Sequence, residues 1–287
     1  MAFPGALGIS RAERFRRLHR ARRPFLLPNA WDVPSARVFE DAGFPAVATS
    51  SAGIMVSRGY PDGERMPLPE LVEVVRRIAS RLRVPVSADV VSGYGKSPAA
   101  VGRTVQRMLR AGAIGVNLED HNPASGKLFP LDVQLQRIQA VLRTAQRSGV
   151  PLVLNARTDA LNHAPGDKEA RFEEAVRRAQ AFRDAGADCV YPMGLTDRTA
   201  IRAFVLALRC PVNVMVRRGL PSVRELARLG VRRVSFGPSA SYAAMGLLKR
   251  ASREALTRGT FRTLVEGAIT FDELNRLAER RGPSASG

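Results

Sequence analysis

The chain of 287 residues predicts a single α/β domain of the (β/α)8 (TIM) barrel class, and three observations support this prediction. Short runs rich in Val, Ile and Ala alternate with longer segments whose apolar residues recur at helical spacing. There are eight such runs, the number that closes a barrel. A small residue followed by Gly ends four of the helical segments just before the next run. The repeated βα unit is therefore the organising element of the chain.

The eight expected strands are short and apolar, which is typical of parallel strands buried on both faces. They are expected at 25–28, 46–50, 86–90, 115–119, 152–156, 189–193, 212–216 and 233–237. An open doubly wound sheet is the alternative, and it usually carries a Gly-rich fingerprint after its first strand. Here that segment reads PNAWDVPSARVF and contains no glycine before Gly43. The sequence favours the barrel.

The expected helices have recognisable ends. Asp32 and Asp132 precede helical segments and are expected to cap them through a side-chain oxygen. Glycines 43, 112, 186 and 230 are expected to close four helices. The single domain is expected to span residues 1–287, with a barrel core at about 24–250 and a C-terminal helical extension at about 251–280.

Composition limits the classes of protein that the chain can belong to. No apolar run approaches the roughly 20 residues of a membrane helix, and the N-terminal segment has no leader-like apolar region with a cleavage site. We therefore expect a cytoplasmic protein with no membrane partner. The two cysteines, Cys189 and Cys210, lie among apolar residues that resemble strands, so no disulfide framework is expected.

The charge balance is strongly basic, with 45 Lys and Arg against 26 Asp and Glu and a net charge of +19. Such a balance raises the question of a nucleic-acid partner. The arginines, however, are spread over nearly every helical segment instead of gathering on one element with aromatic residues. We expect no nucleic-acid partner, and a positive surface that attracts an anionic substrate.

Polar residues at the carboxyl ends of the strands are the candidate site, because the active sites of such barrels are built there. Six strand ends carry them, in the segments 29–32, 49–53, 89–95, 119–121, 155–159 and 235–239. Carboxylates from neighbouring strands can hold a hard divalent cation, and an arginine with a serine loop can hold an anion beside it. The ends therefore predict a site for a metal ion and an anionic ligand.

The motifs SADVVSGYG, VNLEDH and NARTDA, preceded by TSSAGIMVSRGYPDG, occur in an order that resembles the isocitrate lyase and phosphoenolpyruvate mutase superfamily over about residues 24–250. In that family an eight-stranded barrel binds magnesium and a pyruvyl-type acid. Its members break or make a C–C or C–P bond through an enolpyruvate-like intermediate. The resemblance implies the same general chemistry for this chain.

Carried over position by position, the resemblance implies that Ser50, with the amides of Ser51 and Ala52, grips the substrate carboxylate. Asp62 would lie over the pocket. Asp89 would ligate Mg2+, with Mn2+ as the alternative ion.

On the following strands, Glu119 would hold the ion through water and Arg157 would contact the substrate oxygens. An enolate is stabilised when a cation and a guanidinium already face the oxygen that becomes negative. Tyr94 is expected to pack over the ligand, and His121 is a candidate acid or base that could equally cap its loop. Lys127 lies in the segment that acts as a mobile gate in the family.

Two departures from the family pattern narrow the expected activity. Val91 stands where many relatives carry a second acidic residue. The expected metal site therefore has one acidic side chain fewer than in those relatives. The lyase branch has a Lys-[Lys/Arg]-Cys-Gly-His loop after the fourth strand, whereas this chain has NPASGK at 122–127 and no cysteine there. Cleavage of isocitrate or 2-methylisocitrate by the usual route is therefore not expected.

The expected function is that of a magnesium-dependent lyase or decarboxylase of a small oxaloacetate-like 2-oxo acid. Phosphonopyruvate hydrolysis or phosphoenolpyruvate phosphonomutase-type chemistry is the alternative within the family. From another class, the chain could be a catalytically degenerate barrel that serves as a binding protein. The resemblance also implies a homo-oligomer, a dimer or tetramer that exchanges its last barrel helix, and the apolar spacing within Phe261–Leu277 is compatible with that use.

Overall fold

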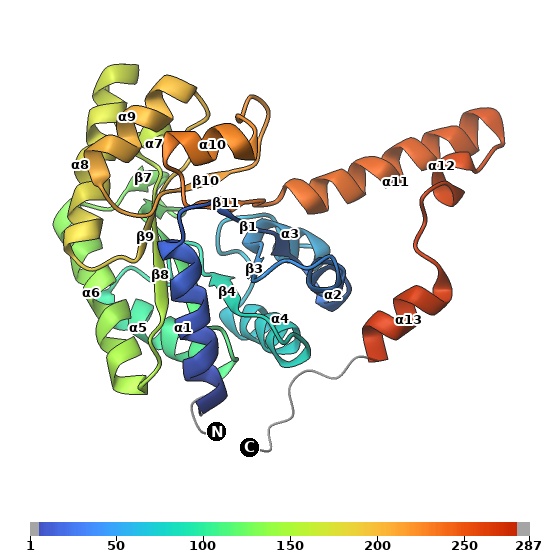
Figure 1. Ribbon diagram of the computed structural model, residues 1–287, viewed down its shortest axis with the longest axis horizontal. Coiled ribbons are helices and arrows are strands. Elements are labelled where there is room, and N and C mark those ends of the chain that lie inside the picture. The colour runs from blue at the N-terminus through green and yellow to red at the C-terminus, as the bar shows by residue number, and fades with distance from the viewer. Residues whose placement is uncertain (1–5, 280–287) are drawn as a thin grey trace.

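The computed structural model describes residues 6–279 and contains a core of parallel strands surrounded by helices (Figure 1). All eight strands predicted from the sequence are present within a few residues of the expected bounds. They are β1 (Phe25–Leu27), continued as β2 (Asn29–Ala30), β3 (Val47–Thr49), β4 (Val86–Asp89), β5 (Gly115–Glu119), β8 (Val153–Thr158), β9 (Cys189–Pro192), β10 (Asn213–Met215) and β11 (Arg233–Ser235).

The strand pairings follow a ring. Six strands pair in the order β2-β3-β4-β5-β8-β9, and three in the order β1-β11-β10, with every pairing between them parallel. A parallel bridge between Val190 and Val212 links β9 to the segment that leads into β10. Only Pro28 separates β1 from β2, so the order of neighbours returns to its start. The fold class predicted from the sequence is confirmed.

Helices lie outside the strands (Figure 1). They are α1 (Ala6–Arg20), α2 (Val33–Asp41), α3 (Ser51–Ser57), α4 (Leu68–Arg81), α5 (Pro98–Arg110), α6 (Leu131–Ser148), α7 (Ala160–His163), α8 (Lys168–Asp184), α9 (Arg198–Leu208), α10 (Val223–Leu229), α11 (Ser239–Arg258), α12 (Arg262–Val265) and α13 (Phe271–Glu279). A two-stranded hairpin, β6 (His121–Asn122) and β7 (Lys127–Leu128), was not expected.

The helix ends follow the sequence signals with one exception. Asp32 caps α2, because its carboxylate accepts the Ser35 amide at 2.8 Å. The four expected glycines follow or cap their helices with φ between 89° and 104°. The prediction for Asp132 is wrong, since α6 begins at Leu131 with Pro130 as its cap residue. Asp132 lies within the first turn, where its charge suits the positive end of the helix dipole.

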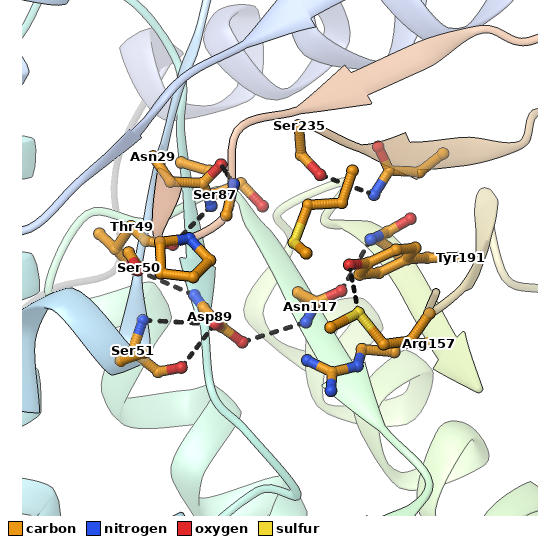
Figure 2. A pocket seen from close by; sticks show the side chains of 18 of the residues that line it. Asn29, Thr49, Ser50, Ser51, Ser87, Asp89, Asn117, Arg157, Tyr191 and Ser235 are labelled. Carbon is orange, nitrogen blue, oxygen red and sulfur yellow. Dashed lines mark hydrogen bonds between the residues drawn. The ribbon is translucent and has the colours of Figure 1, made fainter. Parts of the chain in front are cut away.

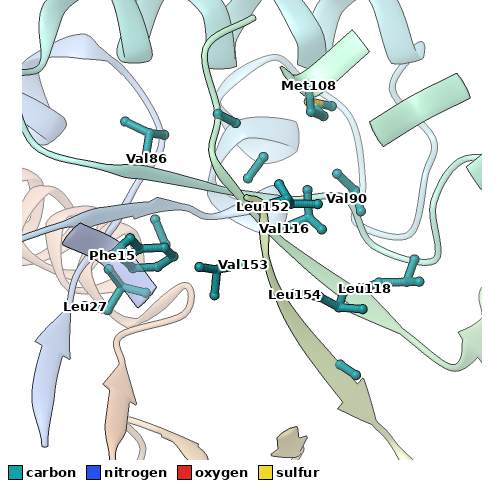
Figure 3. Close-up of a cluster of buried hydrophobic side chains, with 14 of the residues drawn as sticks. Phe15, Leu27, Val86, Val90, Met108, Val116, Leu118, Leu152, Val153 and Leu154 are labelled. Carbon is teal, nitrogen blue, oxygen red and sulfur yellow. The ribbon is translucent and has the colours of Figure 1, made fainter. Parts of the chain in front are cut away.

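Helix α1 covers the end of the barrel at which the strands begin, a feature that the sequence did not reveal. The ring of its Phe15 is fully buried, near Leu27 of β1 and Val153, the first residue of β8 (Figure 3). A Cβ atom on Gly115 would lie 2.7 Å from that ring, so β5 must begin with glycine to admit it. Helix α1 therefore forms the floor of the barrel.

Helix α11 extends away from the barrel, α12 follows it, and α13 returns to contact α2; helices α11–α13 together are called the arm (Figure 1). The expected boundary near residue 250 falls inside α11, which runs unbroken from the last strand into the arm. Large apolar side chains on the arm are exposed, including Leu256 at 88%, Phe271 at 81% and Val265 at 72%. Residue 280, the expected end of the extension, lies outside the described residues. Within residues 6–279, no helix is both long and apolar enough to cross a membrane.

Candidate active site

A cavity of about 220 Å3 lies inside the barrel and opens at the carboxyl ends of the strands. Six of the residues singled out from the sequence line it, and Figure 2 shows four of them with their neighbours. They are Ser50, Ser51, Ala52, Asp62, Asp89 and Arg157. The structure therefore brings together residues that lie more than one hundred positions apart in the chain.

Asp89, the last residue of β4, is held firmly in place. Its Oδ2 accepts hydrogen bonds from the Ser51 hydroxyl at 2.7 Å and the Ser51 amide at 3.3 Å, and its Oδ1 accepts one from the Asn117 amide group at 3.0 Å (Figure 2). The Asp89 backbone amide donates to the Thr49 hydroxyl at 3.0 Å. Hydrogen bonds to a carboxylate are strong and directional, so they fix its orientation. Asp89 is a preorganised anionic ligand.

Ser50, Ser51 and Ala52 lie where β3 passes into α3. The Ser50 hydroxyl accepts the Gly53 amide at 3.1 Å and so caps α3. The Ser51 amide, expected to bind substrate, is directed at Asp89 instead. Ser51 thus both lines the cavity and orients the carboxylate of Asp89.

Arg157, in β8, is the central cation of the site. Its Nη1 lies 2.7 Å from the Glu119 carboxylate, while its Nε and Nη2 donate to both oxygens of Asp159 at 2.8 and 2.7 Å. These contacts fix the orientation of the Arg157 guanidinium. Burial lowers the pKa of Arg157, but the charges of Glu119 and Asp159 outweigh this and raise it well above its usual range. Arg157 is a fixed positive charge.

Glu119, the last residue of β5, lies beside Arg157 and is buried. Burial raises the pKa of Glu119 well above its usual range, an effect that Arg157 opposes. The negative charges of Asp159, Asp89 and Asp62 raise it further. Glu119, Asp159, Asp89 and Asp62 thus lie close enough to repel one another, and a further cation bound among them would relieve this repulsion.

Asp62 lies at the mouth of the cavity, on the loop between α3 and α4. Its side chain is exposed, and its Oδ1 accepts the amide of Gly63 at 2.9 Å. Partial loss of hydration raises the pKa of Asp62, and the charge of Asp89 adds to the shift. This is the position over the pocket that the resemblance implied.

A second hollow of about 370 Å3 adjoins the cavity and shares Ser51, Asp62 and Arg157 with it. His121 lines this hollow together with His163, and the two rings stack with centroids 4.2 Å apart. The Nε2 atom of His121 is buried without a hydrogen-bond partner. Loss of hydration, followed by the charge of His163, lowers the pKa of His121, so a neutral ring is favoured.

Tyr94, Lys127 and Val91, which were also considered from the sequence, do not line the main cavity. Tyr94 does not line either hollow, and its amide donates to Glu64 at 2.8 Å. Lys127 is exposed on the β6–β7 hairpin. Val91 lines the second hollow and has a φ of 52°, a left-handed conformation that β-branched residues rarely adopt.

Two polar residues deeper in the barrel, Ser87 and Asn117, were not predicted, and Asn155 was included only within the strand-end segment 155–159, without a role of its own. Ser87, Asn117 and Asn155 all line the cavity, and each lies two residues before a site residue on the same strand. Side chains two apart on a strand face the same side. The period-two alternation of polar residues in Ser87–Asp89, Asn117–Glu119 and Asn155–Arg157 was the available signal.

Comparison with known proteins agrees with the fold and this arrangement. A family model for phosphoenolpyruvate phosphomutase matches residues 15–256. An oxaloacetate decarboxylase of Pseudomonas putida (strain GB-1) is 30% identical over 241 residues, covering 80% of this chain and 80% of the relative. A crystal structure from Burkholderia cenocepacia J2315, described as that of a lyase or mutase, is 36% identical, with a TM-score of 0.88 and coverage of 95% and 97%.

Two further solved structures carry ligands. Oxaloacetate acetylhydrolase in complex with the product oxalate is 29% identical, with a TM-score of 0.82 and coverage of 94% of each chain. Phosphonopyruvate hydrolase in complex with oxalate and Mg2+ is 26% identical, with a TM-score of 0.81 and coverage of 93% and 94%.

Fold and site together define a barrel enzyme that breaks or makes C–C or C–P bonds. The chain belongs to the phosphoenolpyruvate phosphomutase family, within the isocitrate lyase and phosphoenolpyruvate mutase superfamily. The family resemblance found in the sequence is confirmed.

Proposed function

We propose that this enzyme is a magnesium-dependent lyase or decarboxylase that acts on a small 2-oxo acid such as oxaloacetate and forms an enolpyruvate. The observation that carries the proposal is the fixed carboxylate of Asp89 on the wall of a small cavity that the guanidinium of Arg157 also lines. Relatives that act on or bind oxaloacetate and oxalate support the choice of substrate class.

The residues present fit a magnesium ion. Mg2+ usually takes one or two carboxylates from the protein and completes its shell with water and substrate oxygens. Asp89 and Glu119, from neighbouring strands, would supply the two carboxylates, and a dication would relieve the repulsion among the carboxylates of the site. No group of three or more His, Cys, Asp or Glu side chains arranged for a metal occurs in residues 6–279, so substrate and water oxygens would have to supply the remaining ligands.

Each residue of the site would have a defined task in decarboxylation. A bound Mg2+ ion would polarise the 2-oxo group of the substrate. Arg157 would bind the oxygen that becomes negative as carbon dioxide leaves, since its guanidinium is held in place by Asp159 before the reaction begins. Asp62 lies over the cavity mouth and His121 in the adjoining hollow, where either could hold the proton that the enolpyruvate takes up.

The absence of a cysteine in the loop at 122–127 favours decarboxylation over isocitrate-type cleavage. The two cysteines of the chain do not replace it. Burial raises the pKa of Cys189 to about 12 and that of Cys210 to about 11, so both stay protonated. Neither thiol lines the cavity.

C–P bond chemistry on phosphonopyruvate or phosphoenolpyruvate is the second candidate. It is supported by the likeness to phosphonopyruvate hydrolase bound to oxalate and Mg2+, and its branch also lacks the cysteine. A third reading, a barrel that only binds its ligand, is supported by Val91, which replaces a common acidic residue beside the proposed metal.

Parallel assays of pyruvate release distinguish these three candidate functions. Oxaloacetate, phosphonopyruvate and 2-methylisocitrate would each be tested with Mg2+, with Mn2+ or with EDTA. Asp89→Ala is the test variant, and Asp132→Ala, which changes an exposed carboxylate on α6, is the matched control. We expect release from oxaloacetate that needs the metal and Asp89 but not Asp132. Release from phosphonopyruvate alone supports the second candidate, and release from none contradicts the proposal.

We also propose that the arm mediates assembly into a dimer or tetramer. Its exposed apolar side chains, among them Leu256 and Phe271, resemble surface that another subunit covers. Light scattering after size-exclusion chromatography tests this. The full chain should elute as an oligomer and Leu256→Glu/Phe271→Glu as a monomer, and a monomeric full chain would contradict the proposal.

A further inference from the structure

The interior of this barrel is polar well below the mouth of the cavity. Barrel interiors are usually filled by layers of branched apolar side chains. Here the lining includes Ser87, Asn117, Asn155, Asn213, Arg233 and Ser235, all on strands (Figure 2 labels Ser87, Asn117 and Ser235). Polar groups in a core are costly unless they are hydrogen-bonded, so this lining needs a reason beyond packing.

Among these side chains, Arg233 is the one whose burial destabilises the folded protein most, because it is charged. It is the first residue of β11, is 2% exposed, and its guanidinium carbon lies 6.0 Å from the ring centroid of Phe15 on the barrel floor. Among the described side chains it has no ion-pair or hydrogen-bond partner, and its Nε and Nη1 are buried and unpaired. Burial lowers the pKa of Arg233, but a guanidinium stays charged at neutral pH. A buried cation without an anion is strongly unfavourable.

Other groups around the cavity are also unpaired. The Ser87 hydroxyl and the Oδ1 atoms of Asn155 and Asn213 are buried without partners. The Asn213 amide nitrogen donates to the Ser235 hydroxyl at 3.1 Å, and a hydroxyl can donate or accept, so Asn213 can turn either end of its amide to the cavity. The chamber therefore offers one cation together with several free hydrogen-bonding groups.

No carboxylate of the site forms an ion pair with Arg233. The charge of Asp89 raises the pKa of Arg233, but the oxygens of Asp89 accept their hydrogen bonds from Ser51 and Asn117 and none from Arg233. Glu119 and Asp159 are paired with Arg157. The charge of Arg233 is thus left for a ligand that enters the cavity, and 220 Å3 admits a small acid of a few water-sized groups, at about 30 Å3 each.

We propose that this chamber binds the distal carboxylate of a linear 2-oxo dicarboxylic acid, with Arg233 as its counter-ion, while the 2-oxo carboxyl end faces Arg157. The inference rests on the proposed function and deepens it, since it makes Arg233 the residue that selects dicarboxylates over monocarboxylates. Ser87 and Asn213 supply additional hydrogen bonds to the same carboxylate. The preference for dicarboxylates over monocarboxylates then comes from the floor of the barrel and not from the metal.

The test compares two acids of equal length, 2-oxoglutarate and 2-oxopentanoate, which differ only in the distal carboxylate. Their affinities would be measured by calorimetry with saturating Mg2+, with oxalate as a short ligand that does not reach the floor. The test variant is Arg233→Met. Arg232→Met is the control, because Arg232 is the adjacent residue of the chain and donates only to the carbonyls of Gly230 and Val231.

We expect the wild type to bind 2-oxoglutarate more tightly than 2-oxopentanoate. Arg233→Met should weaken 2-oxoglutarate at least about 30-fold, as loss of one partner of a buried charge pair does. It should change the affinities for 2-oxopentanoate and oxalate by no more than about twofold. Arg232→Met should bind all three ligands with the affinities of the wild type. Without ligand, Arg233→Met should be at least as stable as the wild type, because it removes an unpaired buried charge.

Equal weakening of both acids, or no weakening of either, overturns the proposal. So does a stabilisation of the wild type by chloride over gluconate that Arg233→Met loses while acid selectivity is unchanged, because the chamber then holds only an inorganic anion. If Arg233→Met does not fold, Arg233→Lys and Arg233→Gln replace it, and equal selectivity of these two variants overturns the proposal as well. Selective binding without turnover of any acid would contradict the proposed function alone.

Discussion

His19, on the floor of the barrel, should make the stability of the protein depend on pH. Its ring is 2% exposed and lies edge-on to Phe15 and Phe25, with centroids 4.9 and 4.8 Å away. Its Nδ1 donates to the Phe15 carbonyl at 2.9 Å, which leaves the buried Nε2 without a partner. Burial, aided by the nearby charge of Arg233, lowers the pKa of His19 to about 3.

The size of the effect follows from this pKa. The folded-state value lies below that of the unfolded chain, about 6.5. The stabilising contribution is therefore complete above about pH 6.5 and is lost as the pH falls toward 3, because only the unfolded state takes up the proton. Linkage gives a loss of about 2 kcal/mol at pH 5 and about 4 kcal/mol at pH 3.

The perturbation is His19→Gln, which keeps a donor for the Phe15 carbonyl but does not titrate. Urea unfolding followed by circular dichroism at pH 8 and pH 5 gives the free energy of unfolding of both proteins. Other groups titrate in this range, but they are common to both proteins and cancel in the difference. The stability of the wild type relative to the variant should fall by about 2 kcal/mol between pH 8 and pH 5. A relative stability that is the same at both values would refute the reasoning.

Two further substitutions test the site, and a third tests the stability of the loop that follows β4. Val91→Asp should tighten Mg2+ binding at least about tenfold in calorimetry, whereas Val91→Asn should not, because a unit charge 4 Å from another is worth about 4 kcal/mol at an effective dielectric constant of 20. Asp159→Asn should lower kcat/KM about 30-fold or more in pyruvate release by loosening Arg157, and unchanged kcat/KM would argue against that positioning role. Arg137→Met should lower the free energy of unfolding by about 2 kcal/mol in urea titrations, since it removes the donor to the carbonyls of Gly95 and Lys96 and to that of Ser92, which is buried.

The strands were predictable because each apolar run is long enough to form a strand of the barrel wall and ends at residues that favour a turn. Helix α1 was not, since its role depends on Phe15 and His19 reaching a floor that exists only after the strands assemble. The β6–β7 hairpin escaped notice for a related reason. Its strands are two residues each and carry no alternation of apolar residues.

The structure brings together the residues that the family motifs marked, whereas contacts made only in the folded chain could not be predicted from the sequence. Asp89, Glu119 and Arg157 converge as the strand ends required. The engagement of the Ser51 amide by Asp89 could not be read from the sequence, because it depends on how β4 lies against α3. Arg233 also escaped notice, since in the sequence it is one arginine among many and only the fold places it inside the barrel.

The most direct test of the central claim is calorimetric titration of oxalate into the wild type and Asp89→Asn, each with Mg2+ and with EDTA. If Asp89 holds the ion that an enolpyruvate-like ligand binds, oxalate should bind the wild type tightly only with Mg2+, and Asp89→Asn should lose most of that dependence. Oxalate binding that is equally tight in EDTA, or unaffected by Asp89→Asn, would contradict a metal-dependent 2-oxo acid site.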